Sequence, residues 1–317
     1  MSWESGLFAF NVTVPGIIML LLGMVLRRIG WIDEAFNTTA SKLVFNITLP
    51  CLIFFGMTSN HTDLSEHFPL AIYGAVATIV TFLLLELLAP VLIKERRERG
   101  IFVQGGFRSN TAIMGLAYSS IAYGDQGVIV GSIYMISTVV LFNVLSIVTL
   151  TRTLSAPTEG FGIKRIGVGI VKNPLILSIV AGLSFSLMNI PIAEPITRTG
   201  HFMSAMTLPL AMLCTGANIN FRAMFHSSNT ALLATIMRSV VVPLFVTLGA
   251  YLWGFSGISL GVVFLLSATP TAVASYVMTR AMGGDATLAA NIIAMTTITS
   301  FFTAALGLSI LRSSGLI

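Results

Sequence analysis

Long apolar runs separated by short polar stretches make up nearly the whole chain. Each run holds about 20 residues, the number that spans the ~30 Å hydrocarbon core of a bilayer as a helix. The pattern predicts ten transmembrane helices, at about residues 7–26, 38–58, 69–93, 101–123, 128–150, 166–189, 201–219, 231–253, 258–282 and 286–311. The runs are too long, and alternate too weakly, for barrel strands. We therefore expect an all-α integral membrane protein without a soluble domain.

The amino-acid composition also excludes an ordinary soluble protein. Of the 317 residues, 55% are apolar and 9% are charged, and the mean hydropathy is +0.92. A soluble protein carries about 25% charged residues. Cys51 and Cys214 lie in different predicted helices, and we interpret both as small apolar packing residues.

Positive charge is concentrated at one end of the predicted helices. The basic residues that fall in or beside alternate loops are Arg27, Arg28, Lys42, Lys94, Arg96, Arg97, Arg99, Arg152, Lys164, Arg165, Lys172 and Arg222. The intervening loops lack Lys and Arg, apart from Arg198. This positive-inside bias predicts that both termini lie outside the cytoplasm. We therefore attribute the net charge of +5 to orientation in the lipid bilayer and not to binding of nucleic acid.

The second half of the chain repeats positions of the first half, in the same order. The matches are Pro15 with Pro174, Gly23 with Gly182, Thr48-Leu49-Pro50 with Thr207-Leu208-Pro209, Thr111-Ala112 with Thr271-Ala272, Gly124-Asp125 with Gly284-Asp285 and Met135 with Met295. The shift is 159 residues for the first three matches and 160 for the last three. Agreement in order at nearly one shift indicates an internal duplication.

The duplication predicts the topology of the two halves. Each half holds five spans, and this odd number means that the second half enters the membrane from the opposite side. We therefore predict a 5+5 inverted repeat, an architecture typical of secondary transporters. Residues 1–151 form the first five-helix repeat, residues 152–165 a cytoplasmic linker, and residues 166–317 the second repeat.

A polar stretch, Ser109-Asn110-Thr111, interrupts the apolar run 101–123, and Pro270 lies at the corresponding position of the run 258–282. A central proline removes a backbone donor and clashes with the preceding turn, so it kinks or breaks a helix. Freed backbone groups are tolerated at this depth only where protein or a wet cavity surrounds them. A half-helix that begins there favours an anion at its positive end. We predict an anion site here; the alternative is that Asn110 only joins helices.

Two further sets of residues stand out within the predicted spans. Proline recurs at mid-span, at Pro15, Pro50, Pro174, Pro209, Pro243 and Pro270, which favours helices that are irregular for transport or gating over incidental kinks. Four charged residues also fall inside spans, at Glu86, Arg108, Arg238 and Arg280. Such charges normally face the bundle or extend to the membrane surface. Either they extend to the inner surface, or Arg108 or Arg238 attracts an anion or pairs with Glu86.

Signals for enzymatic chemistry are missing from the sequence. The four histidines, His61, His67, His201 and His226, lack metal-ligand spacing. There is no phosphate-binding glycine loop with its lysine, and no nucleophile elbow. We therefore expect no catalytic residues, no metal, no cofactor and no ATP-driven step. Asp125 and Asp285 follow glycines and are interpreted as turn residues.

Several segments together resemble the auxin efflux carrier family, in its bacterial branch related to plant PIN carriers and putative malonate permeases. The most specific is NPLILSIVAGL, from Asn173 to Leu183, and it is joined by NITLPCLIF, SNTAIMG, TLPLAMLCTGANI and the ATP–TA segment around Pro270. The resemblance covers all ten predicted spans.

The resemblance implies that spans 4 and 9 are broken and cross at the membrane midplane. It implies a support domain from spans 1, 2, 6 and 7 and a mobile transport domain from spans 3–5 and 8–10. A small organic acid would bind beside the crossing, with Asn110 facing its carboxylate. Plant members have prolines at positions that fall near Ala117 and Ala274. Here the breaks would either be softer or depend on Gly115 and Pro270.

Together these observations predict a secondary carrier of a small organic anion, auxin-like or a dicarboxylate such as malonate, in a bacterial inner membrane. The expected substrate-site residues are Ser109, Asn110, Thr111, Gly115, Pro270, Thr271 and Ala274. The expected domain-interface or gating residues are Pro15, Pro50, Asn173, Pro174 and Pro209. The mechanism would be an elevator or rocking cycle, and a homodimer is a candidate assembly. The competing hypotheses are a sodium-coupled symporter of the bile-acid type and a non-transporting membrane receptor or scaffold.

Overall fold

Helices make up nearly all of the computed structural model, which describes residues 3–58, 68–154, 174–188, 190–217 and 228–317. No strand occurs within these ranges. The helices are α1 (Trp3–Arg28), α2 (Glu34–Leu43), α3 (Leu49–Thr58), α4 (Phe68–Leu92), α5 (Arg96–Phe107), α6 (Leu116–Leu154), α8 (Pro174–Leu187), α9 (Glu194–Ala217), α11 (Asn229–Ile236), α12 (Val242–Trp253), α13 (Gly257–Ser267), α14 (Ala274–Ala281) and α15 (Ala286–Ser313). Three π-helical turns join some of them: η1 (Val44–Thr48), η3 (Thr111–Gly115) and η4 (Met237–Val241).

Several helices are long and apolar enough to cross a membrane. Within the described ranges there are four: Phe68–Leu92, Thr111–Leu154, Asn229–Trp253 and Ala286–Ser313. These four helices agree with the predicted all-α membrane protein. A helix suits the bilayer because it satisfies its own backbone donors and acceptors.

The longest helix, α6, is two helical arms joined by a sharp turn. Gly124 interrupts it with φ 58° and ψ −143°, a conformation that side chains with a Cβ rarely adopt. The arms fold back on each other, since a Cβ added at Gly131 would lie 2.8 Å from Leu116 Cδ2. The reversal therefore separates the predicted spans 101–123 and 128–150.

The π-helical turns η1 and η4 each end shortly before a proline. Pro50 and Pro243 are the second residues of α3 and α12. A proline cannot donate to the carbonyl four residues earlier, and its ring pushes that turn open. Those carbonyls belong to Asn46 and Ser239, which lie inside η1 and η4, so the prolines account for the widened turns. By contrast, α1 and α9 continue through Pro15 and Pro209.

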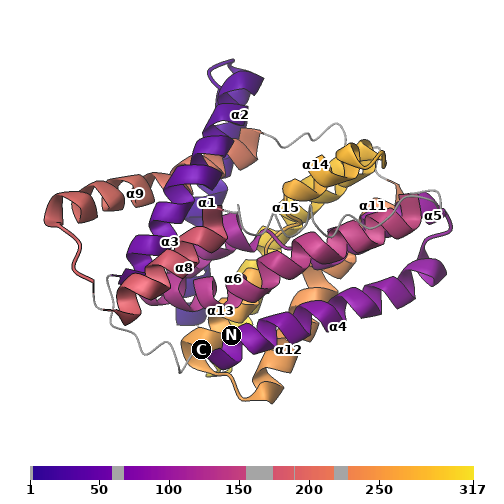
Figure 1. Ribbon diagram of the computed structural model, residues 1–317. Helices are drawn as coiled ribbons and strands as arrows, with labels where there is room; N and C mark the ends of the chain where they lie inside the picture. The colour runs from indigo at the N-terminus through magenta and orange to yellow at the C-terminus, as the bar shows by residue number, and fades with distance from the viewer. Residues whose placement is uncertain (1–2, 59–67, 155–173, 189, 218–227) are drawn as a thin grey trace.

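The helices gather into two groups. Figure 1 shows α1, α2, α3, α8 and α9 on one side, where α1 packs along α9 and α3 along α8. The remaining helices form the second group, in which α6 packs against α4, α5 and α13. The groups meet along α1 and α15. Ile17 and Met19 of α1 pack there against an apolar cluster that contains Phe301 of α15. The two segments that interrupt helices lie in the second group.

Candidate functional site

Two non-helical segments pair with each other in the interior of the second helix group. Helix α5 ends at Phe107 and α13 ends at Ser267, and both segments that follow leave the helical conformation. The amide of Asn110 donates to the carbonyl of Pro270 at 2.8 Å, and the amide of Ala272 donates to the carbonyl of Arg108 at 3.0 Å. An isolated antiparallel bridge thus joins Ser109 to Thr271. Buried backbone groups need partners, and these two hydrogen bonds supply partners for two amides and two carbonyls.

Thr271 fixes the second segment to its neighbours. Its amide donates to Thr296 Oγ1 of α15 at 3.1 Å, and its hydroxyl donates to the carbonyl of Gly105 in α5 at 2.6 Å. Pro270 has no amide proton, so α13 cannot continue regularly through this position. These bonds replace the helical bonds that Pro270 prevents, and they tie the segment between α13 and α14 to α5 and α15.

Arg238 lies at the carbonyl ends of α5 and α13. It projects from η4 and is 1% exposed. Its Nε donates to Thr269 at 3.0 Å, its Nη1 to Gly106 and Phe107 at 3.2 and 3.3 Å, and its Nη2 to Ser267, all at carbonyl oxygens. The last carbonyls of a helix lack intrahelical partners and carry partial negative charge, so they are a favourable place for a buried cation. One interpretation of the sequence expected Arg238 to extend to the membrane surface. The structure instead buries it among backbone carbonyls.

Arg108 is nearly as deeply buried but is bonded very differently. It is 5% exposed and follows the last residue of α5. Its Nη2 donates to Asn143 Oδ1 at 2.8 Å, and its Nη1 lies 3.4 Å from Met278 Sδ. The acceptors are thus a neutral amide and a thioether, and the latter is weak.

The side-chain amide of Asn110 lies at the paired segments without a hydrogen bond to the described residues. The backbone carbonyl of Asn110 accepts from Met114 and Gly115, each at 3.1 Å, and so starts η3. Its side chain does not cap that turn, and within the described residues the 5%-exposed amide has no hydrogen-bond partner. A buried polar group costs free energy unless it is bonded. This amide is therefore available to a bound group.

A narrow crevice lies beside the paired segments, between α5, α14 and α15. It is lined by Ile101, Gln104, Gly105, Thr271, Ser275, Ala289 and Ile292 and leaves no room for a water molecule. The hydroxyl of Thr279 donates to Gln104 Oε1 at 3.0 Å nearby, and the buried Ser275 hydroxyl has no partner among the described residues. The crevice is too tight for an organic acid in this conformation.

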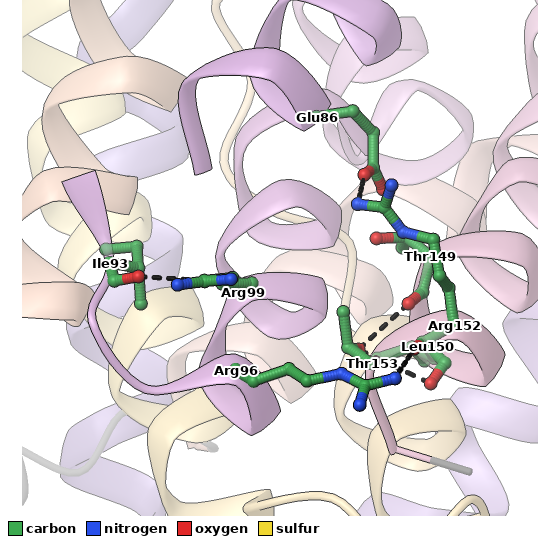
Figure 2. A network of polar contacts seen from close by, with 8 residues as sticks. All are labelled: Glu86, Ile93, Arg96, Arg99, Thr149, Leu150, Arg152 and Thr153. Carbon is green, nitrogen blue, oxygen red and sulfur yellow. Dashed lines mark hydrogen bonds and ion pairs between the residues drawn. The ribbon is translucent and has the colours of Figure 1, made fainter. Parts of the chain in front are cut away.

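Glu86 pairs with neither Arg108 nor Arg238. Its carboxylate forms an ion pair with Arg152 at the end of α6, which corrects the pairing that the sequence suggested. Figure 2 shows this pair beside Arg96, whose Nη2 donates to the Arg152 carbonyl at 3.0 Å. Arg99 caps the Ile93 carbonyl at the end of α4 at 2.9 Å. Glu86 and the basic loop therefore belong to a network remote from the paired segments.

The other residues singled out in the sequence are placed as follows. Gly115 packs against Leu266, where an added Cβ would lie 2.7 Å from Leu266 Cδ2. Ala274 is the exposed first residue of α14, and Arg280 is exposed and donates to Tyr276 at 3.3 Å. Pro174 begins α8, while Asn173 lies outside the described residues.

Sequence reasoning missed three polar contributors, Asn143, Thr296 and Gln104. Asn143 could have been noticed as the one asparagine in the apolar run 128–150. Thr296 and Gln104 give no such signal, because they matter only through contacts with distant segments. No group of three or more His, Cys, Asp or Glu side chains in the described ranges could hold a metal ion.

Comparison with known proteins gives consistent matches over most of the chain. The family described as "Membrane transport protein" matches residues 8–307. An uncharacterized transporter of Methanothermobacter thermautotrophicus is 26% identical over 289 residues, covering 90% of this chain and 92% of that protein. An uncharacterized transporter of Methanocaldococcus jannaschii is 24% identical over 312 residues, covering 93% and 96% of the two chains.

Proposed function

The chain belongs to the membrane transport protein family, the auxin efflux carrier family that its motifs resemble, and on that premise we propose that it is a secondary transporter of a small organic anion. The observation that carries the proposal is the pairing of residues 108–110 with residues 270–272, where the buried Asn110 amide lacks a partner among the described residues. Interrupted helices with uncommitted polar groups are where secondary transporters bind their substrates.

The anion preference follows from the charges around the paired segments. Two buried arginines, Arg108 and Arg238, lie beside them. Helix-end carbonyls accept from Arg238. Arg108 takes part in no ion pair of the described residues, so it supplies the unbalanced positive charge. The helical stretch that begins at Thr111 adds the positive end of its dipole. A small carboxylate, auxin-like or a dicarboxylate such as malonate, satisfies both the positive potential and the Asn110 amide.

The proposed architecture is a 5+5 inverted repeat in which spans 4 and 9 are interrupted and cross. Supporting it, the two residues joined by the 2.8 Å amide–carbonyl bond, Asn110 and Pro270, are also 160 positions apart, the shift of the internal duplication. A two-fold relation between the halves brings equivalent positions together near its axis. The termini would lie outside the cytoplasm of a bacterial inner membrane.

The proposed cycle is of the elevator type, with the two helix groups of Figure 1 as support and transport domains. The surfaces between α1 and α15 are apolar, so sliding one past the other breaks few hydrogen bonds. Gly16 of α1 faces Tyr118 and Phe301 across this boundary, and it has no side chain that would project into the opposite surface. The membrane potential supplies ~2.3 kcal/mol per charge per 100 mV, so no ATP is needed to move an anion.

Uptake into proteoliposomes tests the function. The full chain is reconstituted, a potential is imposed without ATP, and uptake of labelled malonate and indole-3-acetate is measured. Asn110→Ala should abolish uptake while leaving the thermal unfolding of the protein unchanged. The matched control is Asn46→Ala, because Asn46 is exposed and its amide donates to the Lys42 carbonyl, four residues earlier, at 2.8 Å. Equal uptake by wild type and Asn110→Ala refutes the assignment.

A further inference from the structure

Arg108 carries a buried charge that no acidic side chain of the described residues neutralises. The ion pairs in these ranges are Arg27–Glu34, Arg152–Glu86 and Arg198–Glu194. Among the described residues, the hydrogen-bond acceptors of the Arg108 guanidinium are Asn143 Oδ1 and Met278 Sδ. A buried charge without a counter-charge is strongly unfavourable, so such groups are generally paired or functional.

Arg238 provides the internal comparison. Both arginines are buried beside the same paired segments, but Arg238 donates to four helix-end carbonyls. Its charge is therefore balanced by the helix dipoles of α5 and α13. Arg108 has one neutral oxygen acceptor and one sulfur, and so keeps donor capacity for a further acceptor.

We propose that Arg108 binds a carboxylate group of the transported anion, that Asn143 positions the guanidinium, and that Met278 lies where one carboxylate oxygen binds. This inference rests on the proposed function and names the group that selects acids over neutral analogues. The planar guanidinium matches a carboxylate through two parallel N–H···O bonds.

The two neighbours of Arg108 suit these different roles. Asn143 is held by its own helix, because its Nδ2 donates to the Val139 carbonyl at 3.0 Å, which aims Oδ1 at Arg108. Met278 lies on the short helix α14 and is an unbranched, flexible side chain with a weak acceptor. A carboxylate oxygen is a much better acceptor than a thioether, so the substrate displaces the sulfur without breaking a strong bond.

The inference predicts a loss of charge selectivity when the guanidinium is removed. The full-length protein is assayed in proteoliposomes and by thermal unfolding with two matched pairs of probes, malonate with malonamide and indole-3-acetate with indole-3-acetamide. At least one acid should raise the unfolding temperature of the wild type and be transported by it. The corresponding amide should do neither. In Arg108→Gln the KM for that acid should rise about tenfold or more, since hydrogen bonds to charged groups are the strong ones. The preference over the amide should disappear.

A second substitution at Arg108 separates charge from geometry, and a substitution at Arg280 is the control. Arg108→Lys keeps the charge without the planar fork, so it should retain the acid preference with weaker binding. Arg280→Gln is the matched control, because Arg280 is an exposed arginine of α14 that donates to Tyr276. Its selectivity should equal that of the wild type.

Met278→Glu tests the same site without removing Arg108. The new carboxylate should pair with the guanidinium, raise the thermal stability of the protein and abolish stabilisation by the added acid. If Arg108→Gln does not fold, Met278→Glu still tests whether the acid binds at Arg108. Acid-induced stabilisation of Met278→Glu equal to that of wild type overturns the subsite.

The outcomes also separate the subsite from the function on which it rests. If Asn110→Ala abolishes uptake while Arg108→Gln retains the wild-type preference for acid over amide, the subsite is wrong and the transport function stands. If the wild type neither binds nor transports either acid, the anion-transport function is contradicted together with the subsite.

Discussion

The guanidinium Nε of Arg238 donates a hydrogen bond to the carbonyl oxygen of Thr269 at 3.0 Å. Thr269 lies just beyond α13, and the same guanidinium reaches the last two carbonyls of α5. One side chain from η4 therefore ties together the ends of two helices that are more than 150 residues apart in the sequence. The interrupted segments can leave the helical conformation because this cation, together with their mutual pairing, satisfies the backbone groups that the interruption frees.

Replacing Arg238 should destabilise the protein strongly. Arg238→Met keeps the apolar stem and removes donors to four carbonyls, so the free energy of unfolding should fall by about 3 kcal/mol or more. The measurement is thermal or denaturant unfolding in detergent. Arg280→Met, in an exposed position, should change stability by less than about 0.5 kcal/mol. Equal effects of the two substitutions would contradict the structural role of Arg238.

The contact between α1 and α9 depends on Gly23. A Cβ added there would meet the backbone of Leu213, with the Leu213 Cα only 3.0 Å away, and backbone cannot move aside as a flexible side chain can. Gly23→Ala should therefore cost about 1–3 kcal/mol of stability.

Gly16→Ala is the control on the same helix. An added Cβ at Gly16 would lie 3.6 Å from the rings of Tyr118 and Phe301, which is ordinary contact. Both substitutions gain the same helix propensity, up to about 1 kcal/mol, so their difference isolates the steric term. A comparison of the two melting curves in detergent measures it, and Gly23→Ala melting at or above Gly16→Ala would show that the close approach is unimportant.

The long apolar helices were predictable because a local pattern encodes them. The apolar runs 69–93 and 286–311 correspond to α4, Phe68–Leu92, and α15, Ala286–Ser313. The polar stretch begins at Ser109, two residues after the end of α5, and the chain turns at Gly124, where the sequence indicated a loop. In each case a residue's own chemistry, its hydropathy or its allowed dihedral angles, determines the outcome.

The partners of the buried arginines were not predictable in the same way. Arg238 binds backbone carbonyls, and every residue has a carbonyl, so no sequence pattern marks Gly106 or Thr269 as an acceptor. Glu86 was a reasonable partner for a buried arginine, yet Arg152 at the helix end reaches it instead. Packing of α4 against α6 decides that choice, and it depends on tertiary structure.

Asp285 and Asp125 are matched in the proposed repeat, and Asp285 caps a helix. Asp285 Oδ1 accepts from the amides of Thr287 at 2.8 Å and Leu288 at 3.0 Å, at the start of α15. Asp285→Ala should therefore lower the stability by about 1 kcal/mol, while Asp285→Asn keeps an acceptor and should cost less.

Asp125 is the matched control. It is exposed, and its carboxylate has no hydrogen bond recorded among the described residues. Asp125→Ala should change the unfolding temperature by less than half of the Asp285→Ala effect. A larger effect at Asp125 than at Asp285 would mean that the N-cap contributes little to this fold.

Uptake should be independent of sodium. In sodium-coupled carriers of this general architecture, the coupling ion is coordinated by unwound carbonyls and the carbonyl ends of half-helices. Here those carbonyls, on Gly106, Phe107 and Ser267, are already bound by the Arg238 guanidinium, a permanent cation. Adding Na⁺ at the same place would bring two positive charges together in a low-dielectric interior, which is strongly unfavourable.

Replacing sodium with choline on both sides of the proteoliposome membrane should therefore leave the initial rate of acid uptake unchanged at a fixed potential. A severalfold loss of rate in choline, restored by sodium, would instead support the symporter of the bile-acid type and place its ion away from Arg238.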